Sequence, residues 1–516
     1  MTENVVSAPQ TVAAPDQPAA DPAETARGAE LRAQPRPRLF RAVWRWHFYA
    51  GLLVIPIIVI LSLSGIVYLF KPQIDSVFYG HVRNVDGRGA TLSYAKQLAA
   101  VKATLPGASV TSVAPAPDSK RSTQFGVTTK AGRDWTVFVD PYTAKVLGHR
   151  DNQRYLPAIA LDIHGSLLAS RFMDEKGKWG DRLIELATSW AVVLVITGMY
   201  LWWPRGRRRS LRQALTPRLR ARSLRVRWRD VHAITGVAFS FVFLFFLVTG
   251  LAWSGVWGQK YNDIATKVGS SYPPGTFDGV PSKKVEDVVK GGKPAWAAGS
   301  LPVPPSATRG GRPGHTGHND HARLQAIRWN PEAGAPLDAV VARAQQMGMA
   351  PGTIITFPAD KTSSYAVSLY PDNDVEPNQN ALNERFAFVD QYTAKPVGDF
   401  RYGQFGVMAQ ATDFGIALHE GRQFGLLNQI GALVATLALL LSCATAIVMW
   451  RKRRPTGIGA PRRAPNRKLG AGVVAITLGL GVLFPLLGLS ILALLAFDFV
   501  IVKHIAPLRR ALGAAR

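Results

Sequence analysis

Five apolar runs constrain the fold of this 516-residue chain more than any other feature. Each is long enough for an α-helix to cross the hydrocarbon core of a bilayer, which takes about 18–20 residues. The sequence therefore predicts an α-helical membrane protein with several spans. The runs lie near residues 48–70, 186–203, 233–257, 426–450 and 471–502.

The formal net charge of +27 is concentrated in the short connections between these runs. Residues 204–229 hold eleven arginines and no Asp or Glu, and residues 451–468 are similarly basic. Positively charged loops stay on the cytoplasmic side, so we expect 71–180 and 258–423 to face the periplasm. We interpret the charge as setting orientation in the bilayer and expect no nucleic acid as a partner.

The first forty residues are rich in Ala, Pro and Gln and lack the apolar core of a signal peptide. We expect them to form a disordered cytoplasmic tail. Cys443 is the only cysteine and falls within an apolar run, so the outer regions contain neither disulfides nor thiolate metal sites. Any metal chemistry would use His, Asp, Glu or Met.

Two apolar runs begin in the same way. WRWHFYAG at 44–51 contains His47, and WRDVHAITG at 228–236 contains His232. In both, a glycine follows the histidine four residues later, as Gly51 or Gly236. Further along each run, a Ser-Gly or Thr-Gly pair stands at the same separation from the histidine. These coincidences indicate an internal duplication.

The outer regions repeat as well. VDPYTAKVLG at 139–148 matches VDQYTAKPVG at 389–398, and each is followed by a histidine, His164 or His419, just before the next apolar run. The repeated unit is thus a span, an outer region, a second histidine and a second span. Alternating apolar residues predict strands at 135–140 and 385–390, with short amphipathic helices over 93–105 and 336–347.

The fold class predicted is a four-helix transmembrane core from the duplicated unit, with a C-terminal membrane segment and two periplasmic α/β domains. The last apolar stretch is broken at Pro485 and forms either a kinked fifth span or a hairpin. The boundaries are a tail over 1–40; the first span over 41–70; periplasmic domain 1 over 71–180; the second span over 181–203; a basic cytoplasmic loop over 204–229; the third span over 230–257; periplasmic domain 2, with a Pro/Gly/His-rich insertion, over 258–423; the fourth span over 424–450; a second basic cytoplasmic loop over 451–469; the C-terminal membrane segment over 470–502; and a tail over 503–516.

Four histidines at symmetric places in or beside spans need a common explanation, because such residues usually pair, bind a cofactor or line a polar path. Two facing neutral imidazoles are what a six-coordinate haem iron requires. At i+4, Gly51 and Gly236 lie on the histidine face of the helix and let a flat macrocycle approach. We interpret Ser64-Gly65, Thr197-Gly198 and Thr249-Gly250 as small residues for close helix packing.

Other polar residues allow more than one interpretation. Asp162 and Asp230 either orient a histidine ring or are interfacial charges, and the second is favoured because i and i+2 point to different helix faces. His315, His318 and His321 have metal-binding spacing but stand in a Pro/Gly-rich stretch typical of a solvated loop. The tryptophans at span ends, such as Trp202, are typical of interfacial anchors.

The pattern resembles the PepSY-associated transmembrane helix family, which includes iron-regulated inner-membrane ferrisiderophore reductases. WRWHFYAG, the two VDxYTAKxxG segments, LDIHG and ALHEG carry the resemblance, which covers roughly 40–455. It implies periplasmic PepSY domains on a four-helix core that binds two b-type haems. Carried over, His47 and His232 ligate the iron of an inner haem, and His164 and His419 that of an outer one.

The resemblance implies a transmembrane oxidoreductase of the bacterial inner membrane that passes electrons to a periplasmic ferric chelate such as a ferrisiderophore, for iron acquisition. No Gly-rich dinucleotide motif follows a strand, so the electron donor is a cytoplasmic protein or a quinol. Arg171 and Arg422 would contact haem propionates or an anionic chelate, or serve as interfacial charges. The alternatives are a haem-free regulatory or binding membrane protein and a metal or siderophore transporter, which would need more polar residues along the spans.

Overall fold

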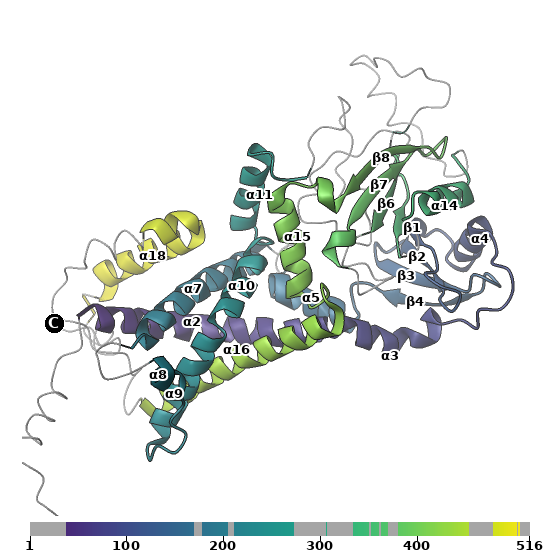
Figure 1. Cartoon of the computed structure of the whole chain (residues 1–516). Helices are drawn as coiled ribbons and strands as arrows, with labels where there is room; N and C mark the ends of the chain where they lie inside the picture. The colour runs from purple at the N-terminus through teal and green to yellow at the C-terminus, as the bar shows by residue number, and fades with distance from the viewer. Residues whose placement is uncertain are drawn as a thin grey trace, which may run out of the picture.

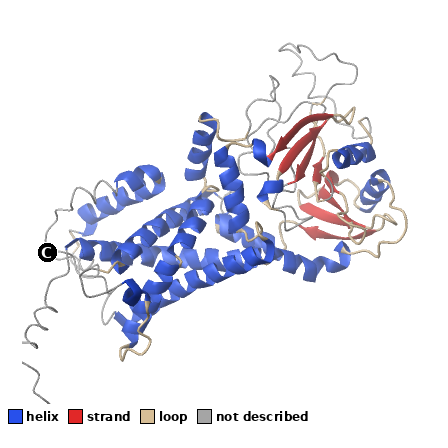
Figure 2. Ribbon diagram, viewed as in Figure 1, coloured by secondary structure: helices blue, strands red, loops and turns tan. Residues whose placement is uncertain are grey.

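The computed structural model describes residues 38–169, 178–204, 211–272, 306, 334–349, 352–360, 363–369, 380–453, 478–502 and 504–505. Within these ranges, a bundle of long apolar helices adjoins a domain built on a single antiparallel sheet (Figures 1 and 2).

Three helices are long and apolar enough to cross a membrane: α2 (Arg38–Leu69), α7 (Lys178–Trp202) and α16 (Gly425–Arg453). They include the first, second and fourth apolar runs. Helices α9 (Leu224–Ala238) and α10 (Ser240–Leu251) meet the same criterion only when counted together as one bent span.

The third apolar run, predicted as a span over 230–257, is divided between these two helices. Its two parts are bent by 60° at Phe239. The Ser240 hydroxyl donates a hydrogen bond of 2.8 Å to the Val237 carbonyl. Side-chain bonds of this kind compete with the helical backbone ladder, and serines are found at many helix kinks.

The same run ends at Leu251, where the chain turns into helix α11 (Trp257–Lys267). Two carboxylates of α7 stabilise the turn. Asp181 accepts from the Gly255 backbone N–H at 2.8 Å, and Glu185 accepts from the Val256 and Trp257 N–H groups at 2.8 and 3.1 Å. Negative charge is favourable at a helix N-terminus, which accounts for the buried Glu185.

The last apolar segment forms α18 (Pro485–Phe497) and one π-helical turn, η5 (Asp498–Val502). Residues 478–483 are also helical, and the helix is interrupted at Phe484, directly before Pro485, as the sequence predicted. Pro485 begins α18, a position where no N–H partner is needed. The segment packs on the bundle: the Trp190 indole N–H of α7 donates to Ser490 Oγ at 3.0 Å, and Trp257 stacks on Phe484. Pro485–Ile501 is shorter than the three full spans.

Each half of the chain contributes four strands and a covering helix to the sheet domain. The strands are β1 (Ser109–Ala114), β2 (Thr123–Thr128), β3 (Asp134–Val139) and β4 (Val146–Asp151) from the first half, then β5 (Ile354–Thr356), β6 (Tyr365–Leu369), β7 (Arg385–Val389) and β8 (Pro396–Arg401). Their order is β4-β3-β2-β1-β5-β6-β7-β8. The expected strands and amphipathic helices are present, the latter as α4 (Tyr94–Thr104) and α14 (Leu337–Gln346).

The two outer regions are not separate domains, which corrects the predicted architecture. β1 and β5 pair antiparallel, with Ser112 opposite Thr356 and Val113 opposite Ile355. Pairing joins two edges that would otherwise expose unpaired N–H and C=O groups. One sheet therefore spans both halves.

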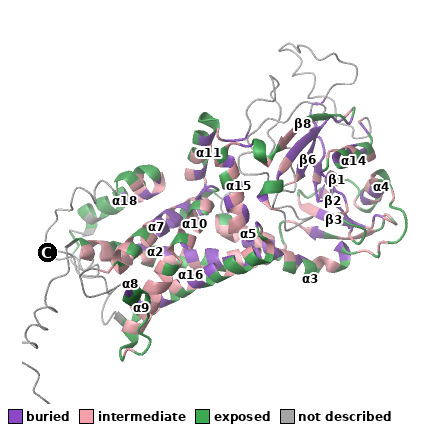
Figure 3. Cartoon of the chain, in the orientation of Figure 1, coloured by how far each residue is buried: buried purple, intermediate pink, exposed green. Residues whose placement is uncertain are grey.

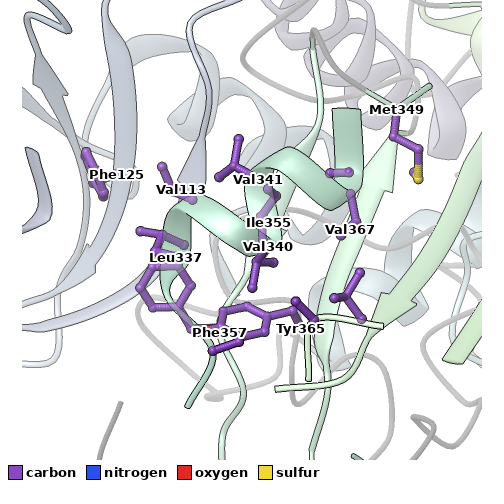
Figure 4. Packing of buried hydrophobic residues seen from close by; sticks show 14 of the residues in the cluster. Val113, Phe125, Leu337, Val340, Val341, Met349, Ile355, Phe357, Tyr365 and Val367 are labelled. Carbon is purple, nitrogen blue, oxygen red and sulfur yellow. The ribbon is translucent and has the colours of Figure 1, made fainter. Parts of the chain in front are cut away.

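A shared core confirms the union. Leu337, Val340 and Val341 of α14 pack among buried residues from strands of both halves (Figure 4). Full burial of such side chains contributes about 1.5–3 kcal/mol each. Asp338 of α14 also accepts from the first-turn N–H groups of Tyr94 and Ala95, at 2.7 and 3.2 Å, and so caps the helix of the other half. In Figure 3, buried residues, drawn in purple, continue along the strands of the sheet.

The repeated VDxYTAK segments form the same turn twice. Asp140 accepts from the Tyr142 N–H, and Asp390 accepts from the Tyr392 N–H, both at 2.9 Å. Ala144 and Ala394 then adopt left-handed backbone angles, with φ of 57° and 53°. A side-chain-capped turn of this kind explains why these letters are the best preserved part of the repeat.

Between the bundle and the sheet lie α3 (Lys71–Arg83), α5 (Leu156–Ser166) and α15 (Val407–His419) (Figure 1). The 3₁₀ turns η3 (Ala381–Asn383) and η4 (Tyr402–Gln404) flank β7 and β8, and the short helix α8 (Leu211–Leu215) precedes α9. α5 packs against α2 and α7, and α15 packs against α10. These contacts place the second histidine of each half beside the bundle.

Candidate functional site: two facing histidine pairs

The structure brings the four predicted histidines together as two pairs. The ring centroids of His47 on α2 and His232 on α9 are 6.4 Å apart, with an interplanar angle of 77°. Those of His164 on α5 and His419 on α15 are 6.3 Å apart, at 89°. Each pair takes one histidine from each half of the chain, as the pseudo-twofold repeat predicted.

In the first pair, both rings are held through Nδ1 by a neighbouring helix. His47 Nδ1 lies 2.9 Å from Thr197 Oγ1 of α7. That hydroxyl donates its own proton to the Val193 carbonyl at 2.6 Å, so its oxygen is free to accept from the ring. His232 Nδ1 donates to the Ser442 carbonyl of α16 at 3.0 Å, with Thr445 Oγ1 at 3.2 Å.

The second pair is held in the same way. His164 Nδ1 donates to the Leu61 carbonyl of α2 at 3.0 Å. His419 Nδ1 lies 2.8 Å from Thr249 Oγ1 of α10, and that hydroxyl donates to the Phe245 carbonyl at 2.8 Å. All four imidazoles therefore meet an acceptor at Nδ1.

An acceptor at Nδ1 fixes the proton on that nitrogen and leaves Nε2 with a lone pair, which is the form of histidine that ligates metals. Metal-binding histidines typically donate their other N–H to a carbonyl or hydroxyl in this manner, which sets the ring orientation. The hydrogen bonds thus prepare all four rings for ligation through Nε2.

The ring separations fit a metal ion between two imidazoles. A bond of about 2.0–2.1 Å on each side puts the two nitrogens about 4 Å apart. Ring bonds near 1.35 Å give an imidazole a radius of about 1.1 Å, so the centroids of collinear ligands would be about 6.3 Å apart. The observed 6.4 and 6.3 Å agree with this value.

The glycines that follow the Ser and Thr residues leave room for the histidine rings. Their interpretation as residues for close helix packing missed this role. A Cβ added to Gly198 or Gly65 would lie 3.3 Å from Cε1 of His47 or His164, and one added to Gly250 would lie 3.9 Å from Cε1 of His419. The signal in the sequence is the recurrence of Ser/Thr followed by Gly or Ala on four helices, Thr445-Ala446 being the fourth.

Gly51 and Gly236, four residues after His47 and His232, differ in the space around them. A Cβ at Gly236 would meet nothing within 4 Å, as expected for a face left open to a flat ligand. A Cβ at Gly51 would meet Leu194 Cδ2 at 3.9 Å, an ordinary contact with α7. The open-face interpretation therefore rests on Gly236.

Charged residues near the histidines form their own ion pairs. Asp230 binds Arg218 and Arg229, each at 2.8 Å, which favours the interfacial-charge interpretation. Arg422 pairs with Glu420. Arg171, His315, His318 and His321 lie outside the described residues.

Two further observations bear on a bound cofactor. Arg41 Nε, six residues before His47, is buried and has no hydrogen-bond acceptor among the described residues, and a carboxylate would supply one. Across those same residues, no three His, Cys, Asp or Glu side chains gather to hold a metal ion. Each histidine pair is thus a two-ligand site, suited to an ion whose other ligands come from elsewhere.

Comparison with known proteins gives a family. A search of curated proteins finds no match. The model of the PepSY-associated TM region matches residues 44–453, which covers all four histidines, the three long apolar helices and the sheet domain. The chain therefore belongs to the PepSY-associated TM region family.

Proposed function

We propose that the protein is a haem-containing reductase of the bacterial inner membrane that passes electrons to a periplasmic ferric chelate such as a ferrisiderophore. The observation that carries the proposal is the pair of facing imidazole sites, each with Nδ1 engaged and Nε2 left for a metal. A porphyrin would supply the four ligands that each two-histidine site lacks.

Bound haem b would supply one-electron chemistry, and the work of the chain is to hold and insulate it. His47 and His232 would hold one iron, and His164 and His419 the other. The acceptors on α2, α7, α10 and α16 keep the rings in place, and Gly198 and Gly65 leave room for them.

The two sites stand at different depths of the bundle. α2 carries His47 and, fourteen residues later, the Leu61 carbonyl that holds His164. A helix rises 1.5 Å per residue, so the sites are about 21 Å apart along α2. The hydrocarbon core is about 30 Å thick, which is too far for one efficient electron-transfer step. Two haem sites would divide this distance into shorter steps.

Orientation follows from charge and from the position of the sheet domain. His232 lies on the helix that continues from the arginine-rich segment 218–229, so the first pair would receive electrons on the cytoplasmic side, from a donor protein or a quinol. His164 and His419 lie on the helices next to the sheet domain, which would face the periplasm and the ferric chelate. Each ferric ion takes one electron and leaves as ferrous iron.

The test is haem stoichiometry in the purified full-length chain, measured by reduced-minus-oxidised spectra and pyridine haemochrome. Wild type should hold two b-type haems, and each single His→Ala variant about one. Two double variants test the pairing: H47A/H232A should retain one haem, because both changes empty the same site, whereas H47A/H164A should retain none.

Two other histidines provide matched controls. His81 on α3 and His149 on β4 lie outside the pairs, so H81A and H149A should keep both haems. A colourless wild-type protein, expressed with ample haem, would reject the reductase and leave the regulatory and transport alternatives. Purified protein that holds haem should then reduce a ferric chelate when supplied with an electron donor.

A further inference from the structure

A buried pair of carboxyl groups beside the second histidine pair has no part in holding the histidines. Glu384, at the start of β7, is 2% exposed, and Asp413, in the middle of α15, is 5% exposed. The two carboxyl groups lie within hydrogen-bonding reach of each other. The Tyr272 hydroxyl donates to Asp413 Oδ2 at 2.7 Å.

Both oxygens of Glu384 are buried without a hydrogen-bond donor among the described residues. Asp413 is the neighbour, but two ionised carboxylates have only acceptors to offer each other. A buried acceptor without a partner is costly, and two adjacent negative charges are costlier still. The missing partner is therefore a proton, which would turn the contact into a carboxyl–carboxylate hydrogen bond.

The groups around the pair favour one bound proton. Among the described residues, Arg422 is a cation that acts on Glu384 while paired with Glu420, and the phenols of Tyr272 and Tyr402 are titratable neighbours of the pair. Burial raises the pKa of Asp413 to about 7 against the lowering effect of the Tyr272 hydrogen bond. Burial and the adjacent carboxylate also raise the pKa of Glu384 well above its ordinary value.

The fold itself does not require these acids. Superposing the repeats on their second histidines puts Ala158 of α5 opposite Asp413 of α15. Superposing them on VDxYTAK puts Asp134 opposite Glu384, and Asp134 accepts from the Thr128 hydroxyl at 2.8 Å instead of facing an acid. The first half builds the same strand and helix without a carboxyl pair, so the pair in the second half serves something other than folding.

Helix α15 connects the pair to His419. Asp413 is six residues before His419, which is about 9 Å along the helix axis. An electron arriving between His164 and His419 adds one negative charge at that distance. With an effective dielectric constant near 20, such a charge increases the proton affinity of a carboxylate about twentyfold.

We infer that Glu384 and Asp413 form a proton site linked to the His164–His419 centre: near neutral pH the site is partly occupied, its occupancy rises by up to one proton when an electron arrives there, and it falls again when the electron leaves to the ferric chelate. The inference rests on the proposed function. One electron and one proton enter together, so the buried region gains no net charge. The cytoplasmic donor supplies the electron, and water supplies the proton.

The test is the pH dependence of the midpoint potential of each haem in the full-length chain, from about pH 5.5 to about pH 8.5. In wild type, the potential of the His164–His419 haem should fall as the pH rises. It should be nearly independent of pH in Asp413→Asn and in Glu384→Gln. Asp263→Asn, which changes an exposed carboxylate on α11, should behave as wild type.

Redox difference infrared spectra give a second readout. Reduction of wild type should produce a carboxylic-acid C=O band that shifts in D₂O and is absent from both pair variants. The haem content of each variant shows whether that variant is folded. If only one of the two pair variants folds, it can still be compared with wild type. A haem protein whose pH dependence survives both substitutions would overturn this inference and leave the reductase intact, whereas a chain without haem would overturn both.

Discussion

At the scale of single residues, the chemistry depends on which ring nitrogen carries the proton. Each histidine faces a carbonyl, or a Thr hydroxyl that has already donated its proton, so Nδ1–H is the only tautomer that satisfies the contact. The hydroxyls of Thr197 and Thr249 act as acceptors only because each bonds a carbonyl four residues earlier in its own helix. A common helix feature thus determines that Nε2 is the ring nitrogen that keeps its lone pair.

Thr249→Val tests this dependence, because it removes the acceptor at Nδ1 of His419 while keeping the shape of the side chain. We expect haem affinity at the His164–His419 site to fall about ten- to a hundredfold, as is typical when a partner of a metal-ligating histidine is lost. Haem retention during competition with a haem-binding apoprotein measures the effect. Thr436→Val removes a back-bonded hydroxyl on α16 that faces no histidine, and it should change nothing. Equal retention in the two variants would contradict the role of Thr249.

At the scale of elements, carboxylates from one segment repeatedly cap helices of another. Glu185 of α7 binds the N–H groups that open α11, and Asp338 of α14 binds those that open α4. Each contact satisfies donors that a helix N-terminus leaves unpaired. The bend at Phe239 also belongs to this scale, because the Ser240 hydroxyl bonds the Val237 carbonyl across the break between α9 and α10.

Asp338→Ala should loosen the junction between the halves of the sheet domain. It leaves the Tyr94 and Ala95 N–H groups without their acceptor, and loss of a helix cap costs about 0.5–2 kcal/mol. Hydrogen exchange of residues 94–104 should accelerate while the bundle helices keep their protection. Asp338→Asn, which retains one acceptor oxygen, should lie between the alanine variant and wild type. Unchanged exchange in the alanine variant would show that the cap does not hold α4.

At the scale of the whole molecule, two repeats share one sheet and two facing histidine pairs, so neither half is complete alone. The β1–β5 pairing and the common core under α4 and α14 join the outer regions, while the histidine pairs join the helices. Helix α15 links the two parts, with His419 at the bundle and Asp413 at the sheet domain.

The stability of this junction should depend on pH. Because the folded pKa of Asp413 is raised to about 7 and that of Glu384 is also raised, the folded state keeps a proton that the unfolded chain loses near pH 4. The contribution to stability is complete below about pH 4 and is lost as the pH rises through about 7. Thermal unfolding in detergent should therefore show a lower midpoint at pH 8 than at pH 6, with a smaller difference in Asp413→Asn. An equal difference in that variant would reject the assignment.

Features that depend on local composition and on repetition could be predicted without the structure. Apolar length predicted the spans of α2, α7 and α16, and alternation predicted β3 and β7. The duplication predicted the partners of His47 and His164, because a twofold axis brings equivalent positions of the two repeats together even when they are far apart in the chain. The family of the chain was also apparent from these motifs.

The way in which these parts meet could be seen only in the folded chain. The union of the two outer regions depends on a short β1–β5 pairing that no periodicity reveals, and the bend at Phe239 interrupts an apolar run that shows no break in its composition. The role of the Ser/Thr-Gly pairs, and the contact of Glu384 with Asp413, arise between residues far apart in the chain. Such contacts are set by side-chain geometry across elements, and a pattern along one segment does not contain that information.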